Sequence, residues 1–139
     1  MSEKGFPKSE RIVSQKLIDK LFTSGQSSSL TAFPLRAVFC LMPTESLNPN
    51  LHLHENAKAQ LLLSVPKRRF KHAVDRNRVK RQLREAYRCN KQQLISQVPQ
   101  GQMLLLAFVW MSAEHLPSPQ IEQRVASLLQ RVGKWLNAL

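Results

Sequence analysis

Cysteine and glycine are scarce in this sequence, which has two cysteines and four glycines among 139 residues. Cys40 and Cys89 lack the spacing of a metal site, and in a chain with no recognisable secretion signal we expect reduced thiols. Four glycines provide no loop of the kind that cradles phosphates. The sequence therefore predicts neither a disulfide framework nor a nucleotide-binding loop.

Long hydrophobic runs are also missing. None approaches the roughly 20 residues that a membrane span requires, and residues 1–10 have no apolar signal core, so we expect a cytoplasmic protein. His52, His54 and Glu55 come nearest to a metal cluster, but their loop supplies no further well-spaced ligand. No nucleophile stands in a catalytic context either. We therefore predict no catalytic or metal-binding residues of the protein's own.

Acidic residues are few, with nine against twenty-one Lys and Arg and a net charge of +12. Such a charge attracts polyanions, so nucleic acid is the first candidate partner and an anionic membrane surface the second. Residues 67–88 alone hold ten basic and two acidic side chains. A charge concentrated on one segment is typical of a binding surface.

The apolar pattern predicts a single domain over residues 1–139, with an N-terminal extension at 1–13 and a loop at 43–58. Helices are expected at residues 14–24 and 120–136, and a third helix begins in the basic segment and continues to about residue 96. Strands are expected at 31–42, 59–65 and 103–110. In the first strand the odd positions should face the core and Arg36 should face away. The order helix, strand, strand, helix, strand, helix predicts an α/β sandwich whose basic helix crosses over between the last two strands.

One arc of the basic helix is apolar and is expected to dock on the sheet: Val79, Leu83, Ala86, Tyr87 and Leu94. A neighbouring arc, here called the basic stripe, carries Asn77, Lys80, Arg81, Arg84 and Arg88, with Arg76 at its edge. Asp75 and Glu85 are expected to lie off the stripe.

The alternative interpretation of the stripe is an ordinary solvated helix face. That interpretation predicts mixed charges, because opposite charges four residues apart stabilise a helix and like charges destabilise it. Here four cations of the stripe follow one another at intervals of four, from Arg76 to Arg88. The pattern favours a polyanion partner. Asn77 is open to two roles: a hydrogen bond to a base or ribose, or plain surface polarity.

The run RNRVKRQLREAYR, residues 76–88, closely resembles the RNR motif of the protein subunit of bacterial ribonuclease P. Residues 64–74 resemble the strand and turn that lead into that motif, and residues 6–12 with Leu21, Phe22 and Gly25 fit the family's N-terminal part. These matches cover most of the chain in the family's order.

The resemblance implies a fold like the second domain of ribosomal protein S5, with a left-handed crossover where general statistics favour a right-handed one. It also implies assembly with a catalytic RNA that removes the 5′ leader from precursor tRNA. In that family the RNA carries out the chemistry and holds most of the Mg²⁺. Gln102 stands where the family often has an acidic residue, so no metal ligand is assigned to the protein.

The resemblance also assigns residues to the two RNA partners. Contacts to the catalytic RNA fall on Lys67, Arg68, Lys71, Arg76, Asn77, Arg78, Lys80, Arg81, Arg84 and Arg88. The leader is expected in a cleft between the first helix and the outward face of the sheet, where Phe22, Phe33 and Arg36 are candidates for stacking on bases. Phe22 and Phe33 fit ordinary core positions equally well, and Arg36 stands where the family has an aromatic residue.

Two other functions would use the same helix. A ribosomal or other structural RNA-binding protein needs only the basic stripe and has no part in cleavage. DNA binding is less favoured, because neither a helix-turn-helix nor a dimer element accompanies the helix. The expected partners are therefore RNA, with no DNA and no membrane.

Overall fold

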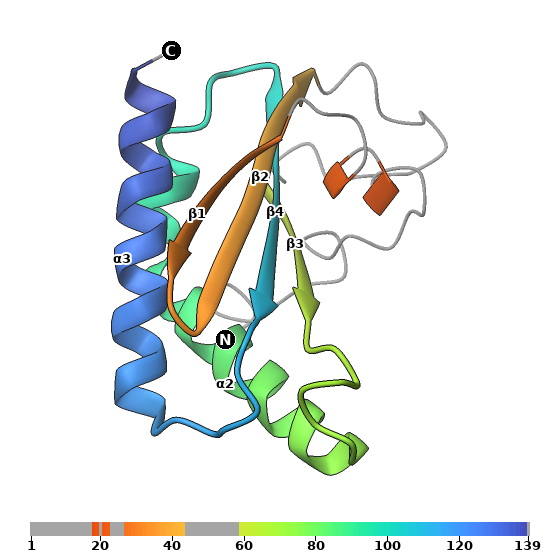
Figure 1. Cartoon of the computed structure of the whole chain (residues 1–139). Coiled ribbons are helices and arrows are strands. Elements are labelled where there is room, and N and C mark those ends of the chain that lie inside the picture. Colours follow the sequence, from red (N-terminus) through yellow and green to blue (C-terminus); the bar gives the residue numbers. More distant parts are fainter. Residues whose placement is uncertain (1–17, 20, 23–26, 44–58, 139) are drawn as a thin grey trace.

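The computed structural model describes residues 18–19, 21–22, 27–43 and 59–138. Its long elements, in chain order, are β1 (Ser28–Ala32), β2 (Leu35–Pro43), β3 (Ala59–Ser64), α2 (Ala73–Ile95), β4 (Gln102–Trp110) and α3 (Ser118–Asn137). Residues 18–19 and 21–22 are helical, within the helix expected at 14–24. The four strands form one sheet in the spatial order β1-β2-β4-β3 (Figure 1). The predicted α/β class is confirmed.

The basic helix is the crossover that the sequence predicts. Strand β4 is antiparallel to β2 and parallel to β3, and α2 joins β3 to β4. Parallel neighbours cannot be joined by a tight turn, so a connecting element has to cross a face of the sheet. The left-handed sense of this crossover stays a prediction of the family resemblance.

The first predicted strand, at 31–42, is wrong in its first part. The chain turns at residues 33–34, and two antiparallel strands pair across the turn, with Thr31 opposite Arg36. Strand β1 is a half-exposed edge strand with the sequence SSLTA, so hydrophobic alternation does not reveal it. Pro34 was the available signal, because a proline has no amide hydrogen for the strand ladder and is typical of turns.

One face of the sheet is covered by α2 and α3. All five residues of the predicted docking arc, from Val79 to Leu94, are buried there. They pack with alternate residues of the strands, among them Phe39, Leu104 and Phe108. The prediction of the docking arc is therefore confirmed, and the opposite side of α2 is left outward.

The other face of the sheet is buried as well, which corrects the expectation that only the odd positions of β2 are in a core. Val38, Cys40 and Met42 pack with alternate residues of β4 and with Leu21 of the first helical segment. Strand β4 is therefore covered on both sides, as its continuous apolar run predicts. Arg36, nearer the hairpin turn on the same face as Val38, is exposed. Cys40 lies within this core and Cys89 is exposed on α2, and neither forms a disulfide.

Candidate nucleic-acid interface

A tight turn after β3 presents the first cations of the basic segment. The amide of Arg69 donates to the carbonyl of Pro66 at 2.9 Å, and the side chain of Phe70 is buried. The turn is thus anchored at its end by an aromatic ring while Lys67, Arg68 and Lys71 are exposed. Three of the residues predicted to contact RNA therefore lie on one ordered turn.

Arg76 is more than a surface cation. Its Nη1 donates to the carbonyl oxygens of Phe70 at 2.8 Å and of Lys71 at 3.0 Å, so it ties the first turn of α2 to the turn before it. The side chain is consequently half-buried rather than fully exposed. Part of its guanidinium is thus used within the protein, a structural role that its position in the basic stripe does not predict.

The middle of α2 carries the exposed part of the basic stripe. Asn77, Arg81 and Arg84 are exposed, as is Arg78 beside them, and Lys80 is half-buried. Because the apolar arc of the same helix is docked on the sheet, these side chains are held on the outward side of a rigid element. A planar guanidinium can bind two phosphate oxygens at once, so the arrangement suits the backbone of a nucleic acid.

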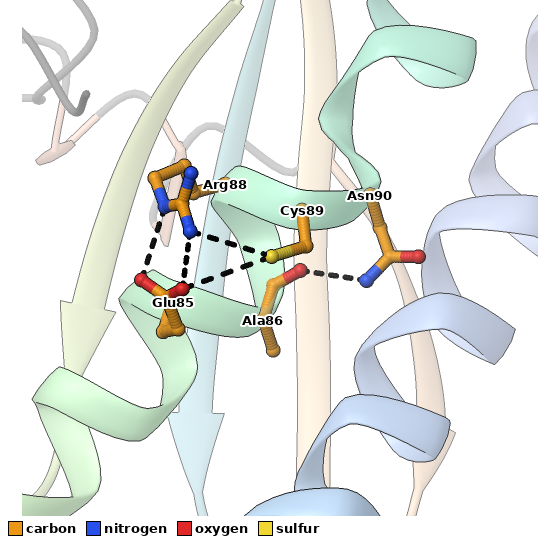
Figure 2. A network of polar contacts seen from close by, with 5 residues as sticks. All are labelled: Glu85, Ala86, Arg88, Cys89 and Asn90. Carbon is orange, nitrogen blue, oxygen red and sulfur yellow. Dashed lines mark hydrogen bonds and ion pairs between the residues drawn. The ribbon is translucent and has the colours of Figure 1, made fainter. Parts of the chain in front are cut away.

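The last cation of the stripe is paired. Figure 2 shows Arg88 beside Glu85: Nε donates to Oε2 at 3.0 Å, and Nη2 donates to the other carboxylate oxygen. The hydrogen bond from Arg88 lowers the pKa of the Glu85 carboxyl below its usual value. Glu85 was expected off the stripe, but it lies against a member of it. The attractive charge of the stripe is therefore weakest at this end.

Beside the stripe, a hollow of about 600 Å³ opens between α2 and the start of α3. Its lining consists of Val74, Arg78, Arg81, Gln82, Glu85 and Ser118. Val74 is 78% exposed, so an apolar surface lies next to two guanidinium groups. Gln82 Nε2 donates to the carbonyl of Leu116 at 3.1 Å and to Ser118 Oγ at 3.0 Å. Ser118, the first residue of α3, completes the lining of the hollow. The sequence of α2 alone therefore does not predict this hollow.

The three residues proposed for the leader lie in two places. Phe22 follows Leu21, which packs on the face of the sheet that also carries Arg36. Phe33 lies in the hairpin turn, where its carbonyl accepts a hydrogen bond from Arg124 of α3 at 3.1 Å. Phe22 is 46% and Phe33 65% exposed, so the core alternative is wrong for both. Most of the first helix is outside the described residues, so the cleft itself stays a prediction.

Among the described residues, no three His, Cys, Asp or Glu side chains gather into a group that could hold a metal ion. His52, His54 and Glu55 lie outside the described residues. In the same part of the chain, no helix is long and apolar enough to cross a membrane.

A sheet with a crossover helix that turns a row of guanidinium groups outward defines an α/β protein of the nucleic-acid-binding class. Residues 6–133 match the family model described as Ribonuclease P. The chain is also 35% identical over 130 residues to the ribonuclease P protein component of Porphyromonas gingivalis, covering 93% of this chain and 87% of that protein. The chain therefore belongs to the ribonuclease P protein family.

Two solved structures agree with this assignment at the level of the fold. The RNase P protein of Staphylococcus aureus has a TM-score of 0.66 at 17% identity, covering 90% of this chain and 96% of that one. The RNase P protein of Thermotoga maritima in complex with 1-(4-fluorophenyl)-2-thiourea has a TM-score of 0.59 at 20% identity, covering 85% and 97%. The α/β fold expected from the resemblance is therefore confirmed, apart from the left-handed sense of the crossover, which stays a prediction.

Proposed function

We propose that the chain acts as the RNA-binding subunit of ribonuclease P, in which it binds the catalytic RNA and the 5′ leader of precursor tRNA. The single observation that carries this proposal is the outward row of exposed cations on α2 in a member of this family. Ribonuclease P is an endoribonuclease, and the protein contributes to it as part of a ribonucleoprotein in the cytoplasm.

The two RNA partners would use opposite sides of the molecule. The basic stripe and the turn before α2 suit the phosphates of a folded RNA, because their cations are carried on a docked helix and a hydrogen-bonded turn. Arg36 and Phe22 suit the unpaired leader, since a guanidinium or an aromatic ring can stack on an exposed base. The sheet lies between these surfaces and supports both.

The chemistry of cleavage is left to the RNA in this proposal. Following the family resemblance, the ions that activate the attacking water are assigned to the RNA. The contribution of the protein is electrostatic and positional: it offsets repulsion between two polyanions and holds the leader in place.

Reconstitution tests the proposal directly. The protein is mixed with the ribonuclease P RNA from the genome that encodes it, and cleavage of precursor tRNA is measured at a low Mg²⁺ concentration where the RNA alone is slow. We expect strong stimulation by the wild-type protein and little by the double variant Arg81→Ala/Arg84→Ala at the same concentration. A folded protein that binds ribosomal RNA and gives no stimulation would instead be a structural RNA-binding protein.

A further inference from the structure

His115 connects two distant parts of the chain at the start of the basic helix. It lies in the segment between β4 and α3, and its ring stacks on Phe70 with centroids 4.5 Å apart and an interplanar angle of 18°. Its Nε2 lies 3.0 Å from Oδ1 of Asp75, in the first turn of α2. One side chain thus contacts both the turn that precedes α2 and the helix itself.

The start of α2 has little other support of its own. His72 occupies the N-cap position and makes no side-chain capping bond, although the first amides of a helix have no partners within it. Asp75 places a negative charge near the positive end of the helix dipole, which is favourable. His115, which lies outside α2, contacts the Asp75 carboxylate. Arg76, within α2, donates to two carbonyls of the turn that precedes the helix. These contacts attach the first turn of α2 to its surroundings, although they accept no hydrogen bond from its first amides.

The same segment holds α2 at a second point. Gln82 Nε2 donates to the carbonyl of Leu116 and to Ser118 Oγ, so residues that follow His115 are attached about two helical turns further along. Two attachments on one helix fix its direction as well as its position. The segment 115–118 therefore acts as a brace along the side of α2.

We propose that His115 is a positioning residue for the catalytic-RNA surface: through Phe70 and Asp75 it holds the turn at 67–71 and the first turn of α2 in the arrangement that RNA binds. This inference rests on the proposed function. Lys67, Arg68 and Lys71 project from that turn, and ordering flexible side chains and loops on binding costs free energy. A turn that is already fixed avoids part of that cost. His115 itself makes no RNA contact in this proposal.

A purely structural role for His115 predicts something different. Loss of its contacts would then lower the melting temperature, but RNA affinity measured well below that temperature would not change, since the protein would still be folded. The two roles are therefore separated by measuring RNA affinity and thermal stability on the same variants.

A double-mutant cycle gives the first test. His115→Phe keeps a ring on Phe70 and removes the hydrogen bond to Asp75, Asp75→Ala removes the acceptor, and the double variant removes both. We expect His115→Phe to weaken binding of the ribonuclease P RNA by about three- to tenfold, which is less than the full contribution of one hydrogen bond to a charged group because His115 acts on RNA binding only through the turn and the helix that it holds. The effects of the two substitutions should be non-additive in RNA affinity. Gln123→Ala, on the exposed side of α3, is the matched control and should bind as wild type.

Amide hydrogen exchange of the free protein gives the second test. Faster exchange in residues 67–77 of His115→Phe, with α3 unchanged, supports the proposal together with non-additive affinities. Additive affinities, or wild-type RNA affinity in His115→Phe whether or not its amide exchange is faster, would overturn it. If the wild-type protein binds no ribonuclease P RNA, the proposed function is rejected, while exchange of the free protein still shows whether His115 fixes the turn.

Discussion

Arg88 and Glu85 lie one turn apart on α2, and the guanidinium of Arg88 donates to both oxygens of the Glu85 carboxylate (Figure 2). The bond lowers the pKa of Glu85, so the pair is intact at neutral pH. Because the pKa is depressed in the folded state, the pair's contribution to stability is present above the ordinary pKa of 4.5 and is lost as the pH falls through the lowered value.

Glu85→Gln should strengthen RNA binding. The substitution removes a negative charge beside the basic stripe and abolishes the ion pair between Glu85 and Arg88. If Arg88 then reaches a phosphate, the log–log dependence of affinity on salt should steepen by about 0.7 to 0.9. Binding titrations at several salt concentrations measure this. Unchanged affinity and slope would place Arg88 outside the RNA interface.

Arg81→Ala and Arg84→Ala should each weaken RNA binding by ~1–3 kcal/mol if the guanidinium makes a bidentate contact. Both side chains are exposed on the outward side of α2, so the melting temperature should stay within a degree or two of wild type, as is usual for surface substitutions. Filter binding and thermal melts on the same preparations provide the measurement. Normal RNA affinity in both variants would reject the stripe as the interface.

Arg76→Ala should differ from those two variants because it lowers stability as well as affinity. It removes hydrogen bonds to the carbonyls of Phe70 and Lys71, and one hydrogen bond from a charged group contributes about 1.5–3 kcal/mol. Denaturant unfolding should show a reduced free energy of unfolding, with an unchanged dependence on denaturant. A fully stable Arg76→Ala protein would mean that these bonds contribute little in solution.

Leu83→Ala tests how α2 is docked. Leu83 is completely buried between the helix and the sheet, so its truncation leaves a cavity and should lower the free energy of unfolding by about 2–5 kcal/mol. The conservative Leu83→Met, of similar volume, should cost less than about 1.5 kcal/mol. Equal stability of Leu83→Ala and wild type would show that another face of the helix is docked.

Arg36→Ala should separate the two RNA surfaces. Arg36 is exposed on β2, on the opposite side of the sheet from α2, so assembly with the catalytic RNA should be normal. Precursor tRNA that carries a leader should bind less well, while leaderless tRNA should bind equally to variant and wild type. Equal losses for both substrates, or none for either, would remove Arg36 from the leader path.

The elements with strong periodicity were predictable from the sequence, and those defined by long-range contacts were not. The docking arc of α2 followed from helical spacing, and the burial of β4 followed from its unbroken apolar run. Strand β1 was not predicted because it is a short edge strand with only two apolar residues, Leu30 and Ala32, which pack against the core from half-buried positions. The second core, on the even side of β2, was not predicted because Leu21, which covers it, is distant in the sequence.

The candidate site was predictable as a set of charges but not as a set of contacts. The exposed cations of α2 followed from composition and spacing, since one arc of the helix had to dock. The pairing of Asp75 with His115 joins residues 40 positions apart, and the bonds from Arg76 depend on how the preceding turn folds back. Side-chain roles of that kind arise only once the tertiary structure brings the partners together.

Strand β4 has a consequence for how this protein can change over evolutionary time. Its neighbouring residues Leu104 and Leu105 support opposite faces of the sheet, one beneath α2 and α3 and the other beneath the first helical segment. A substitution in this strand that alters the packing beneath one proposed RNA surface therefore lies only one residue from the support of the other. The two faces constrain a single strand jointly, so substitutions there should be accepted mainly when they preserve side-chain volume on both sides.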